Sequence, residues 1–314
     1  MNRRVQADLA LVLCSIMWGA TFVIVKNALV DSSVFVFMAV RFTLGALLMI
    51  PLYRRALRNV DRAELWAGVV CGLSLFGGYV FQTGGLVTTT ASKGAFITGS
   101  SVAMVPILLM LFWKRSIGAA VWIGVIAAMV GIYFLTVPGG AHNTLVIGDF
   151  LVLIGAVAFA LQIIFVSLYG VRHSGGAIGF LQIATVAVFS LCALPLAAVT
   201  HAQAPRLHWS PAFVWGIAIT AVLTTAAAFS IQVWAQQFTT ATHAALIFAL
   251  EPVVTAVTSR IFQDEHLGRR ALIGAALILV GIVLAEIKGS SALPHRAGEK
   301  FDEQATEPLG GPPA

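Results

Sequence analysis

The sequence predicts an all-α integral membrane protein with ten transmembrane helices, arranged as two five-helix repeats of inverted topology. Three observations predict this fold: the composition, ten long apolar segments, and an internal similarity at a fixed spacing. Of the 314 residues, 59% are hydrophobic and only 10% are charged, whereas a soluble domain carries about 25% charged residues. So few polar side chains cannot cover a soluble core, and the composition excludes a soluble enzyme and a nucleic-acid-binding protein despite the net charge of +6.

Ten segments are long and apolar enough to cross the hydrocarbon core, which takes about 20 residues in a helix. They are predicted to be helices because backbone groups in lipid must bond within their own segment. The short alternating pattern of a membrane barrel is missing. In chain order the segments are 8–28, 33–53, 65–86, 91–113, 117–137, 147–169, 176–199, 211–235, 241–262 and 269–287.

The first segment could also be a secretory signal peptide, since it follows Arg3 and Arg4. It has no small-residue cleavage site, however, and continues to Lys26, which is too long for the apolar region of a signal peptide. We therefore interpret it as a retained membrane helix.

The basic residues predict the orientation of the chain. Of the 19 Lys and Arg residues, twelve lie on the side of the N-terminus, six lie on the opposite side, and Arg41 lies inside a segment. Because cytoplasmic loops are enriched in Lys and Arg, both termini are expected in the cytoplasm, with the chain in the plasma (bacterial inner) membrane. The polar, Pro/Gly-rich stretch 288–314 is expected to be a disordered cytoplasmic tail.

An internal repeat divides the chain into two predicted domains, 8–137 and 147–287. A shift of 150 residues places 89–132 on 239–282 with twelve identities and no gap, and a shift of 141 places Asp8 on Asp149 and Trp18 on Phe159. Because each copy holds five spans, an odd number, the second copy must be inverted in the membrane. Inverted repeats of this kind build secondary transporters with a substrate site near the midplane.

Ordered short motifs run through both copies: Trp18-Gly19-Ala20-Thr21-Phe22, Arg41-Phe42, Gln82-Thr83-Gly84-Gly85-Leu86, Thr89-Thr90-Ala91-Ser92-Lys93, Val105-Pro106 and Glu251-Pro252-Val253. With this set the chain resembles the ten-span drug/metabolite transporter superfamily with two EamA-type domains. The resemblance covers roughly residues 8–287 and implies a transporter whose relatives mostly export amino acids, metabolites or drugs.

Two charged residues, Arg41 and Glu251, lie deep inside their segments. Ionisable residues at this depth are costly and usually functional. Glu251 could bind a substrate amine or take up a proton, and Arg41 could pair with Glu251 or hold an anionic group. The alternative is that each residue only anchors the packing of its helix.

Further candidates surround these charges. Pro106 and Pro252 each free a helix carbonyl and could form a gate or simply a kink. Lys93 and His243 occupy matching positions in the repeat and could act at a gate or extend to the membrane interface. Polar candidates for substrate binding are Gln82, Gln232, Thr98 and Ser101, which could equally bridge helices, and aromatic candidates are Trp18 and Trp234.

The small-residue spacings Ala127/Gly131 and Gly281/Ala285 predict close helix packing by the fifth and tenth segments, within one chain or in a homodimer. The sequence has neither an ATP-binding P-loop nor a zinc-binding pattern, so no cofactor and no metal are expected.

We therefore predict a secondary transporter that exports small amphipathic metabolites such as amino acids, with a small-molecule substrate and membrane lipid as its partners and no nucleic acid. An uncoupled facilitator of the same solutes is the alternative, followed by a membrane-embedded lipid-modifying enzyme and a non-transporting scaffold.

Overall fold

The computed structural model describes residues 3–136, 146–200, 203–262 and 268–289, and this part of the chain is helical apart from short connections and one isolated β-bridge between Ser32 and Leu207. The helices are α1 (Arg3–Asp31), α2 (Val34–Leu57), α3 (Arg62–Leu86), α4 (Ala91–Gly99), α5 (Ser101–Trp113), α6 (Ala119–Thr136), α7 (Ile147–Tyr169), α8 (Gly175–Val199), α9 (Pro211–Ile219), the π-helix η1 (Thr220–Ala227), α10 (Ala228–Ala235), α11 (Ala241–Phe248), α12 (Glu251–Phe262) and α13 (Arg269–Gly289).

Each predicted apolar segment coincides with one helix or with consecutive helices of a single run. Eight of these runs are long and apolar enough to cross a membrane, and the described apolar helix Ala119–Phe134 is shorter. The chain is therefore an integral membrane protein of nearly all-helical structure, while the count of ten spans stays a prediction. The predicted tail, 288–314, lies outside the described residues from 290 onward.

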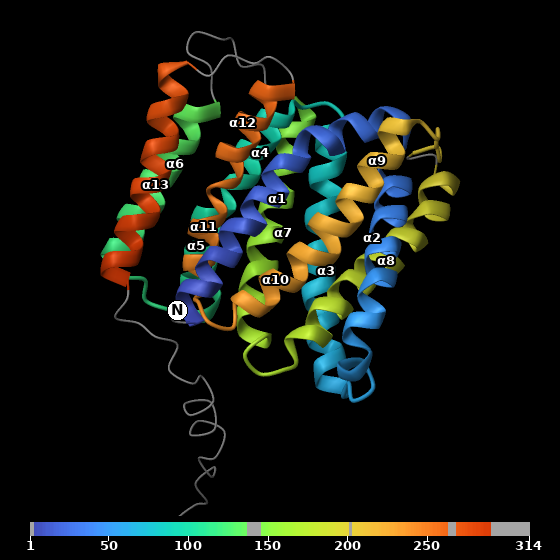
Figure 1. The fold of residues 1–314 in the computed structure, drawn as a ribbon, viewed down its shortest axis with the longest axis horizontal. Helices are drawn as coiled ribbons and strands as arrows, with labels where there is room; N and C mark the ends of the chain where they lie inside the picture. The colour runs from blue at the N-terminus through green and yellow to red at the C-terminus, as the bar shows by residue number, and fades with distance from the viewer. Residues whose placement is uncertain (1–2, 137–145, 201–202, 263–267, 290–314) are drawn as a thin grey trace, which may run out of the picture.

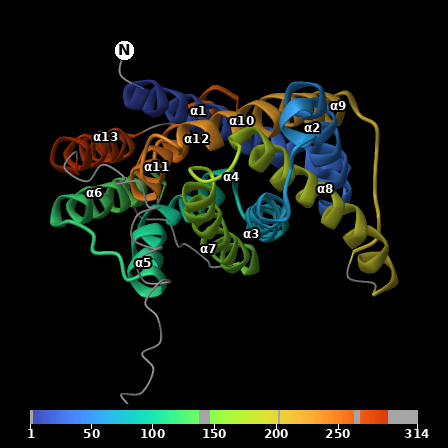
Figure 2. The same ribbon diagram turned by 90° about the horizontal axis from the view of Figure 1, so that it is seen from below.

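The helices form one bundle in which two pairs of helices from different repeats pack at opposite sides. The α6–α13 pair lies at the left of Figure 1 and the α2–α8 pair at the right, with α1, α3, α7 and α10 between them. Seen from below, α1, α10 and α12 lie in one layer and α3, α5 and α7 in the other (Figure 2). The repeat therefore brings corresponding helices together, the second segment with the seventh and the fifth with the tenth.

The α6–α13 contact depends on two glycines that are related by the repeat. A Cβ atom on Gly131 would lie 2.6 Å from the carbonyl oxygen of Gly274, and one on Gly281 would lie 2.6 Å from that of Gly124. A shift of 150 residues exchanges these two contacts. Small residues let membrane helices approach closely, so the predicted close packing of the fifth and tenth segments is confirmed, and within one chain it is against each other.

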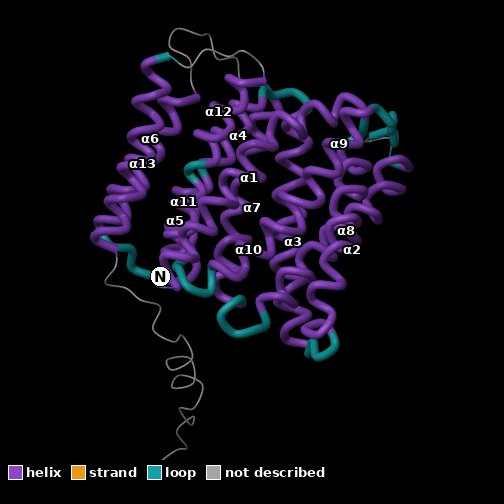
Figure 3. Tube along the Cα trace, in the orientation of Figure 1, coloured by secondary structure: helices purple, strands orange, loops and turns teal. Residues whose placement is uncertain are grey.

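Two segments are broken in the middle, at matching positions of the repeat (Figure 3). The first break lies at Ser100 between α4 and α5, where the Ser100 hydroxyl donates to the carbonyl oxygen of Ile97 at 2.6 Å. Such a side-chain bond competes with the helical backbone bond. The second break lies at 249–250, directly before Pro252 in the first turn of α12, whereas Pro106 lies inside α5. The two prolines therefore occupy different places relative to the two breaks.

The eighth segment holds a π-helix, η1, between α9 and α10. Its wider turn changes which backbone carbonyls are bonded inside the helix, and π-helical turns are frequent at functional sites. No pattern in the sequence predicts this turn, and it lies beside the cavity described below.

Candidate functional site

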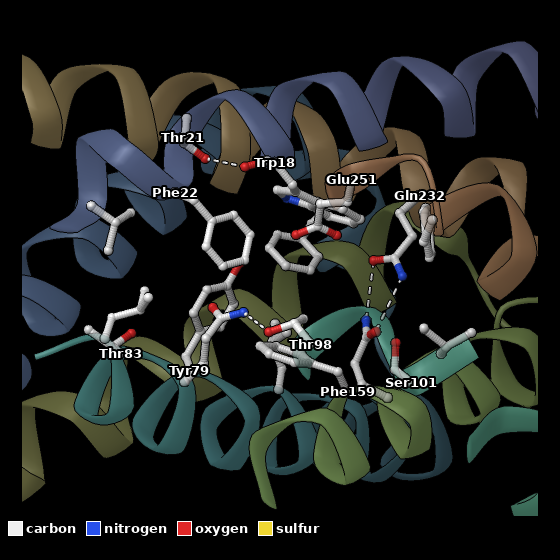
Figure 4. A pocket seen from close by; sticks show the side chains of 18 of the residues that line it. Trp18, Thr21, Phe22, Tyr79, Thr83, Thr98, Ser101, Phe159, Gln232 and Glu251 are labelled. Atoms are coloured by element: carbon white, nitrogen blue, oxygen red, sulfur yellow. Dashed lines mark hydrogen bonds between the residues drawn. The ribbon is translucent and has the colours of Figure 1, made fainter. Parts of the chain in front are cut away.

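A cavity with about 700 Å³ of space not filled by atoms lies among the central helices of the bundle. Figure 4 shows Glu251 and Trp18 on one side of it and Thr98, Ser101 and Phe159 on the other. Its lining residues are Trp18, Thr21, Phe22, Val25, Arg41, Leu75, Tyr79, Gln82, Thr83, Leu86, Thr98, Ser101, Phe159, Gln162, Ile163, Phe229, Gln232, Phe248 and Glu251.

Much of this lining consists of pairs of residues that the repeat relates to each other. The shifts of 141 and 150 residues give these lining pairs: Trp18 and Phe159, Thr21 and Gln162, Phe22 and Ile163, Tyr79 and Phe229, Gln82 and Gln232, Thr98 and Phe248, Ser101 and Glu251. The cavity therefore lies between the two copies of the repeat, and both copies contribute equivalent positions to it. The carboxylate at position 251 has only a hydroxyl as its counterpart.

Aromatic rings form a continuous wall along the cavity. The Trp18 ring lies 5.2 Å from that of Phe229 and 5.2 Å from that of Phe248, between ring centroids. Tyr79 continues the wall, 6.3 Å from Phe229 and 5.2 Å from Phe159 in an edge-to-face arrangement. Such a wall presents both apolar surface and the negative faces of the rings to a ligand.

Glu251 is the first residue of α12, at the break that follows α11, and its side chain extends toward the middle of the cavity (Figure 4). Among the described residues, no hydrogen bond or ion pair reaches its carboxylate, although the hydroxyl of Thr255 donates to the backbone oxygen of Glu251 at 3.0 Å. Gly19 of α1 packs against the same backbone oxygen, which a Cβ atom would approach to 2.5 Å. The cavity thus holds a carboxyl group that makes no ion pair with Arg41 or with any other described residue.

Arg41 also lines the cavity but is only 3% exposed. Its Nε donates to the Thr225 hydroxyl at 2.9 Å, and its Nη2 donates to the hydroxyls of Thr224 at 3.0 Å and Tyr79 at 3.3 Å. Its guanidinium carbon lies 5.0 Å from the ring centroid of Phe42 and 4.8 Å from that of Tyr79. Among the described residues, Arg41 makes no ion pair with Glu251. Such a pair is one of the alternatives that the sequence suggests for Arg41.

The π-helix η1 explains how Arg41 and Trp18 are held. Both Thr224 and Thr225 belong to η1 and accept from Arg41, and the Trp18 indole N–H donates to the backbone oxygen of Thr224 at 3.0 Å. The sequence analysis missed these two threonines, because nothing in an apolar segment marks the position of a π-turn.

The amides and hydroxyls among the candidates bridge helices at the cavity wall. Gln82 of α3 donates to the Thr98 hydroxyl of α4 at 2.9 Å. Gln162 of α7 and Gln232 of α10 donate to each other at 3.2 Å, and Gln162 also donates to Gln182 of α8 at 3.0 Å. Each set of bonds therefore bridges helices within one copy of the repeat, Gln82–Thr98 in the first and Gln162–Gln182–Gln232 in the second, and Gln82, Thr98, Gln162 and Gln232 still line the cavity.

Not all of the predicted site residues line the cavity. Trp234 is 40% exposed and is not among the lining residues. Its ring is tilted relative to that of Phe238, with 5.4 Å between the centroids. Pro106 and Pro252 do not line the cavity either. The analysis did not single out three lining aromatics, Phe159, Phe229 and Phe248. The repeat alignment could have indicated Phe159 and Phe248, which match the candidates Trp18 and Thr98.

Lys93 and His243 are not among the residues that line the cavity. They lie at the upper and lower ends of the bundle in Figure 1, and each contacts the other copy of the repeat. Lys93, in the first turn of α4, lies 2.6 Å from Asp149 at the start of α7. His243, in the first turn of α11, lies 3.2 Å from Asp8 near the start of α1. In Figure 1 α4 and α7 begin at the upper side of the bundle, and α1 and α11 begin at the lower side. A shift along the repeat exchanges the two pairs.

The residues that the structure describes hold no cluster of three or more His, Cys, Asp or Glu side chains that could bind a metal ion. A helical membrane bundle with a cavity between two copies of a repeat, lined by aromatic and polar side chains, defines the class of membrane transporters.

Comparison with known proteins identifies the family within this class. The model of the EamA-like transporter family matches the chain twice, at residues 5–137 and 146–286. The chain therefore belongs to the EamA-like transporter family, within the drug/metabolite transporter superfamily, and the predicted membership is confirmed.

The similar proteins agree with this assignment. An uncharacterized transporter of Archaeoglobus fulgidus is 34% identical over 286 residues, which cover 91% of this chain and 87% of the relative. The uncharacterized transporter YvbV of Bacillus subtilis is 24% identical over 292 residues, covering 92% and 94% of the two chains. A solved crystal structure, 16% identical, has a TM-score of 0.71 and covers 90% of this chain and 97% of its own, which shows that the fold is shared.

Proposed function

We propose that this protein is a secondary active transporter that exports small amphipathic metabolites with an amino group, amino acids among them. It works by alternating access across the plasma (bacterial inner) membrane, with both termini in the cytoplasm. One observation carries the proposal: the Glu251 carboxylate faces a cavity between the two repeats, and no described residue neutralises it. An unneutralised carboxylate inside a membrane protein needs a cation or a proton.

We propose that the two ion pairs at opposite ends of the bundle act as the gates of the transporter. Lys93–Asp149 and His243–Asp8 each tie one copy of the repeat to the other, at opposite ends. Opening one pair while the other stays closed would connect the cavity to one side of the membrane at a time. In inverted repeats, one half rocks against the other around a fixed central site in this way.

In this proposal Glu251 also couples substrate transport to the movement of protons. A carboxylate with no other partner binds either a proton or the substrate amine, so proton uptake on one side favours release of the substrate there. Transport is then an exchange of substrate against protons. An uncoupled facilitator would move the same solutes down their own gradient without responding to a pH gradient.

The test uses the purified full-length protein in lipid vesicles loaded with a radiolabelled amine or amino acid. We expect an imposed pH gradient to drive the substrate against its own gradient, and we expect Glu251→Gln to reduce this driven flux about 100-fold, by analogy with the loss of one strong charged interaction of about 3 kcal/mol. The matched control is Glu64→Gln. Glu64 lies outside the cavity and accepts from the Ser174 backbone N–H at 2.8 Å, a bond that an amide oxygen can keep.

The control variant is expected to transport like the original protein. Driven transport by Glu251→Gln at the original rate would contradict the proposed role of the carboxylate. Flux that ignores the pH gradient in the original protein would favour the uncoupled facilitator.

A further inference from the structure

We propose that the cavity selects monocationic amines with an aromatic or apolar body and discriminates against the corresponding amino acids. The inference rests on the proposed transport function and narrows its substrates: the ammonium group binds Glu251, the ring lies along the aromatic wall, and Arg41, the cationic side chain of the lining, is already bonded within the protein.

The negative end of the cavity is built to receive a cation. The Glu251 carboxylate has no hydrogen bond or ion pair within the described residues, and its counterpart in the other copy is the neutral Ser101. Trp18 lies beside Glu251 (Figure 4), and the rings of Phe229 and Phe248 lie within 5.2 Å of Trp18. An ammonium group gains both from a carboxylate and from the negative faces of aromatic rings, most of all Trp.

The positive end of the cavity is already occupied. Arg41 donates to three hydroxyl groups of its own protein and lies over the rings of Phe42 and Tyr79. Only 3% of its surface is exposed. A substrate carboxylate would have to displace these hydroxyls from the guanidinium or leave its own charge unpaired, and an unpaired charge is costly in such surroundings. The same Arg41 therefore disfavours a zwitterion that reaches from one end to the other.

The remaining walls suit an apolar body. The rings of Phe159 and Tyr79 line the cavity, 5.2 Å apart between centroids. The amide groups of Gln82 and Gln232 donate to Thr98 and Gln162. An aromatic ring of the substrate would therefore be enclosed by rings rather than by hydrogen-bonding groups.

The experiment compares matched ligands that differ only in the carboxylate: phenethylamine with phenylalanine, and tryptamine with tryptophan. Binding to the purified full-length protein is measured by calorimetry, and transport is measured by counterflow in vesicles. We expect each amine to bind about tenfold or more tightly than its amino acid, the fold-change that one charge-assisted interaction supplies. The ligand series needs no variant, so it decides the matter even if substitutions in the cavity impair folding.

Two variants locate the selectivity. Glu251→Gln is expected to reduce amine binding about tenfold or more and to remove the difference within each ligand pair. Glu64→Gln, which removes a carboxylate outside the cavity, is expected to retain the preference for the amine.

Equal or tighter binding of the amino acids would overturn the inference and assign the substrate carboxylate to Arg41, while vesicle transport of either ligand would leave the proposed function standing. Selective binding of the amines without any flux would support the inference and contradict the proposed function. No binding of any of the four ligands would overturn the inference.

Discussion

The two ends of the bundle carry the same contact in different chemical forms. At one end, Asp149 accepts from Lys93 at 2.6 Å, from the Thr89 hydroxyl at 2.6 Å and from the backbone N–H of Val146 at 3.0 Å. At the other end, Asp8 lies 3.2 Å from His243. Thr239, which the repeat aligns with Thr89, has a buried hydroxyl without a hydrogen-bond partner in the part of the chain that the structure describes.

The two pairs differ in the groups that bond the aspartate. Asp149 accepts from Lys93, Thr89 and Val146, and nearby Lys26 donates to the backbone oxygens of Leu86 and Thr89. If the two pairs act as the proposed gates, we expect the His243 end to open at lower cost.

The largest expected effect comes from removing the two aspartates separately. Asp149→Ala leaves Lys93 and Thr89 without their acceptor and should destabilise the protein by about 3 kcal/mol, as for other broken buried pairs. Asp8→Ala, at a more exposed pair, should cost about 1 kcal/mol or less. Thermal unfolding in detergent measures both. Equal losses would show that the two ends are closed to the same degree.

The two threonines should respond with opposite signs. Thr89→Val removes a hydrogen bond to a charged group, which typically costs about 2 kcal/mol. Thr239→Val replaces a buried hydroxyl that has no described partner and should stabilise the protein by about 1 kcal/mol. The same unfolding assay tests both variants, and a loss of stability in Thr239→Val would indicate a partner at that hydroxyl.

The smallest effect is expected from exchanging the two basic residues. The double variant Lys93→His, His243→Lys keeps a basic side chain opposite each of Asp149 and Asp8. We expect transport to change by about threefold, the size of one partly exposed ion pair.

Counterflow of a labelled substrate in vesicles measures the change. A loss of transport in this double variant as large as that expected of Glu251→Gln would contradict the small effect expected of the exchange.

The sequence predicted the helical segments well because a membrane helix is determined mainly by the length of an apolar run. It also predicted Glu251, Arg41, Gln82, Gln232 and Trp18 as candidates for the substrate site, since polar and aromatic groups stand out in an apolar chain. All five line the cavity.

The rest depended on directions that the sequence does not encode. Trp234 and Phe229 lie on the same segment, yet of the two only Phe229 lines the cavity. The sequence could not distinguish them, because a uniformly apolar helix does not show which face meets lipid. The break at Ser100 arises from a hydroxyl bond to Ile97 and not from Pro106. Asp149 looked like an ordinary residue at the start of a span, and only the folded chain brings Lys93 to it.

The contact of Gly19 with the backbone of Glu251 has a mechanical consequence. A single continuous helix, α1, carries Asp8 near its start, Trp18 at the cavity wall and Gly19 against the backbone oxygen of Glu251. The hydroxyl of Thr255 in α12 also donates to the backbone oxygen of Gly19 at 3.0 Å. Because these contacts leave no space between α1 and α12, we expect a tilt of α12 that redirects the Glu251 carboxylate to displace α1 as well. Asp8 lies on the same helix, so the proposed gate at His243 would then respond to the state of Glu251.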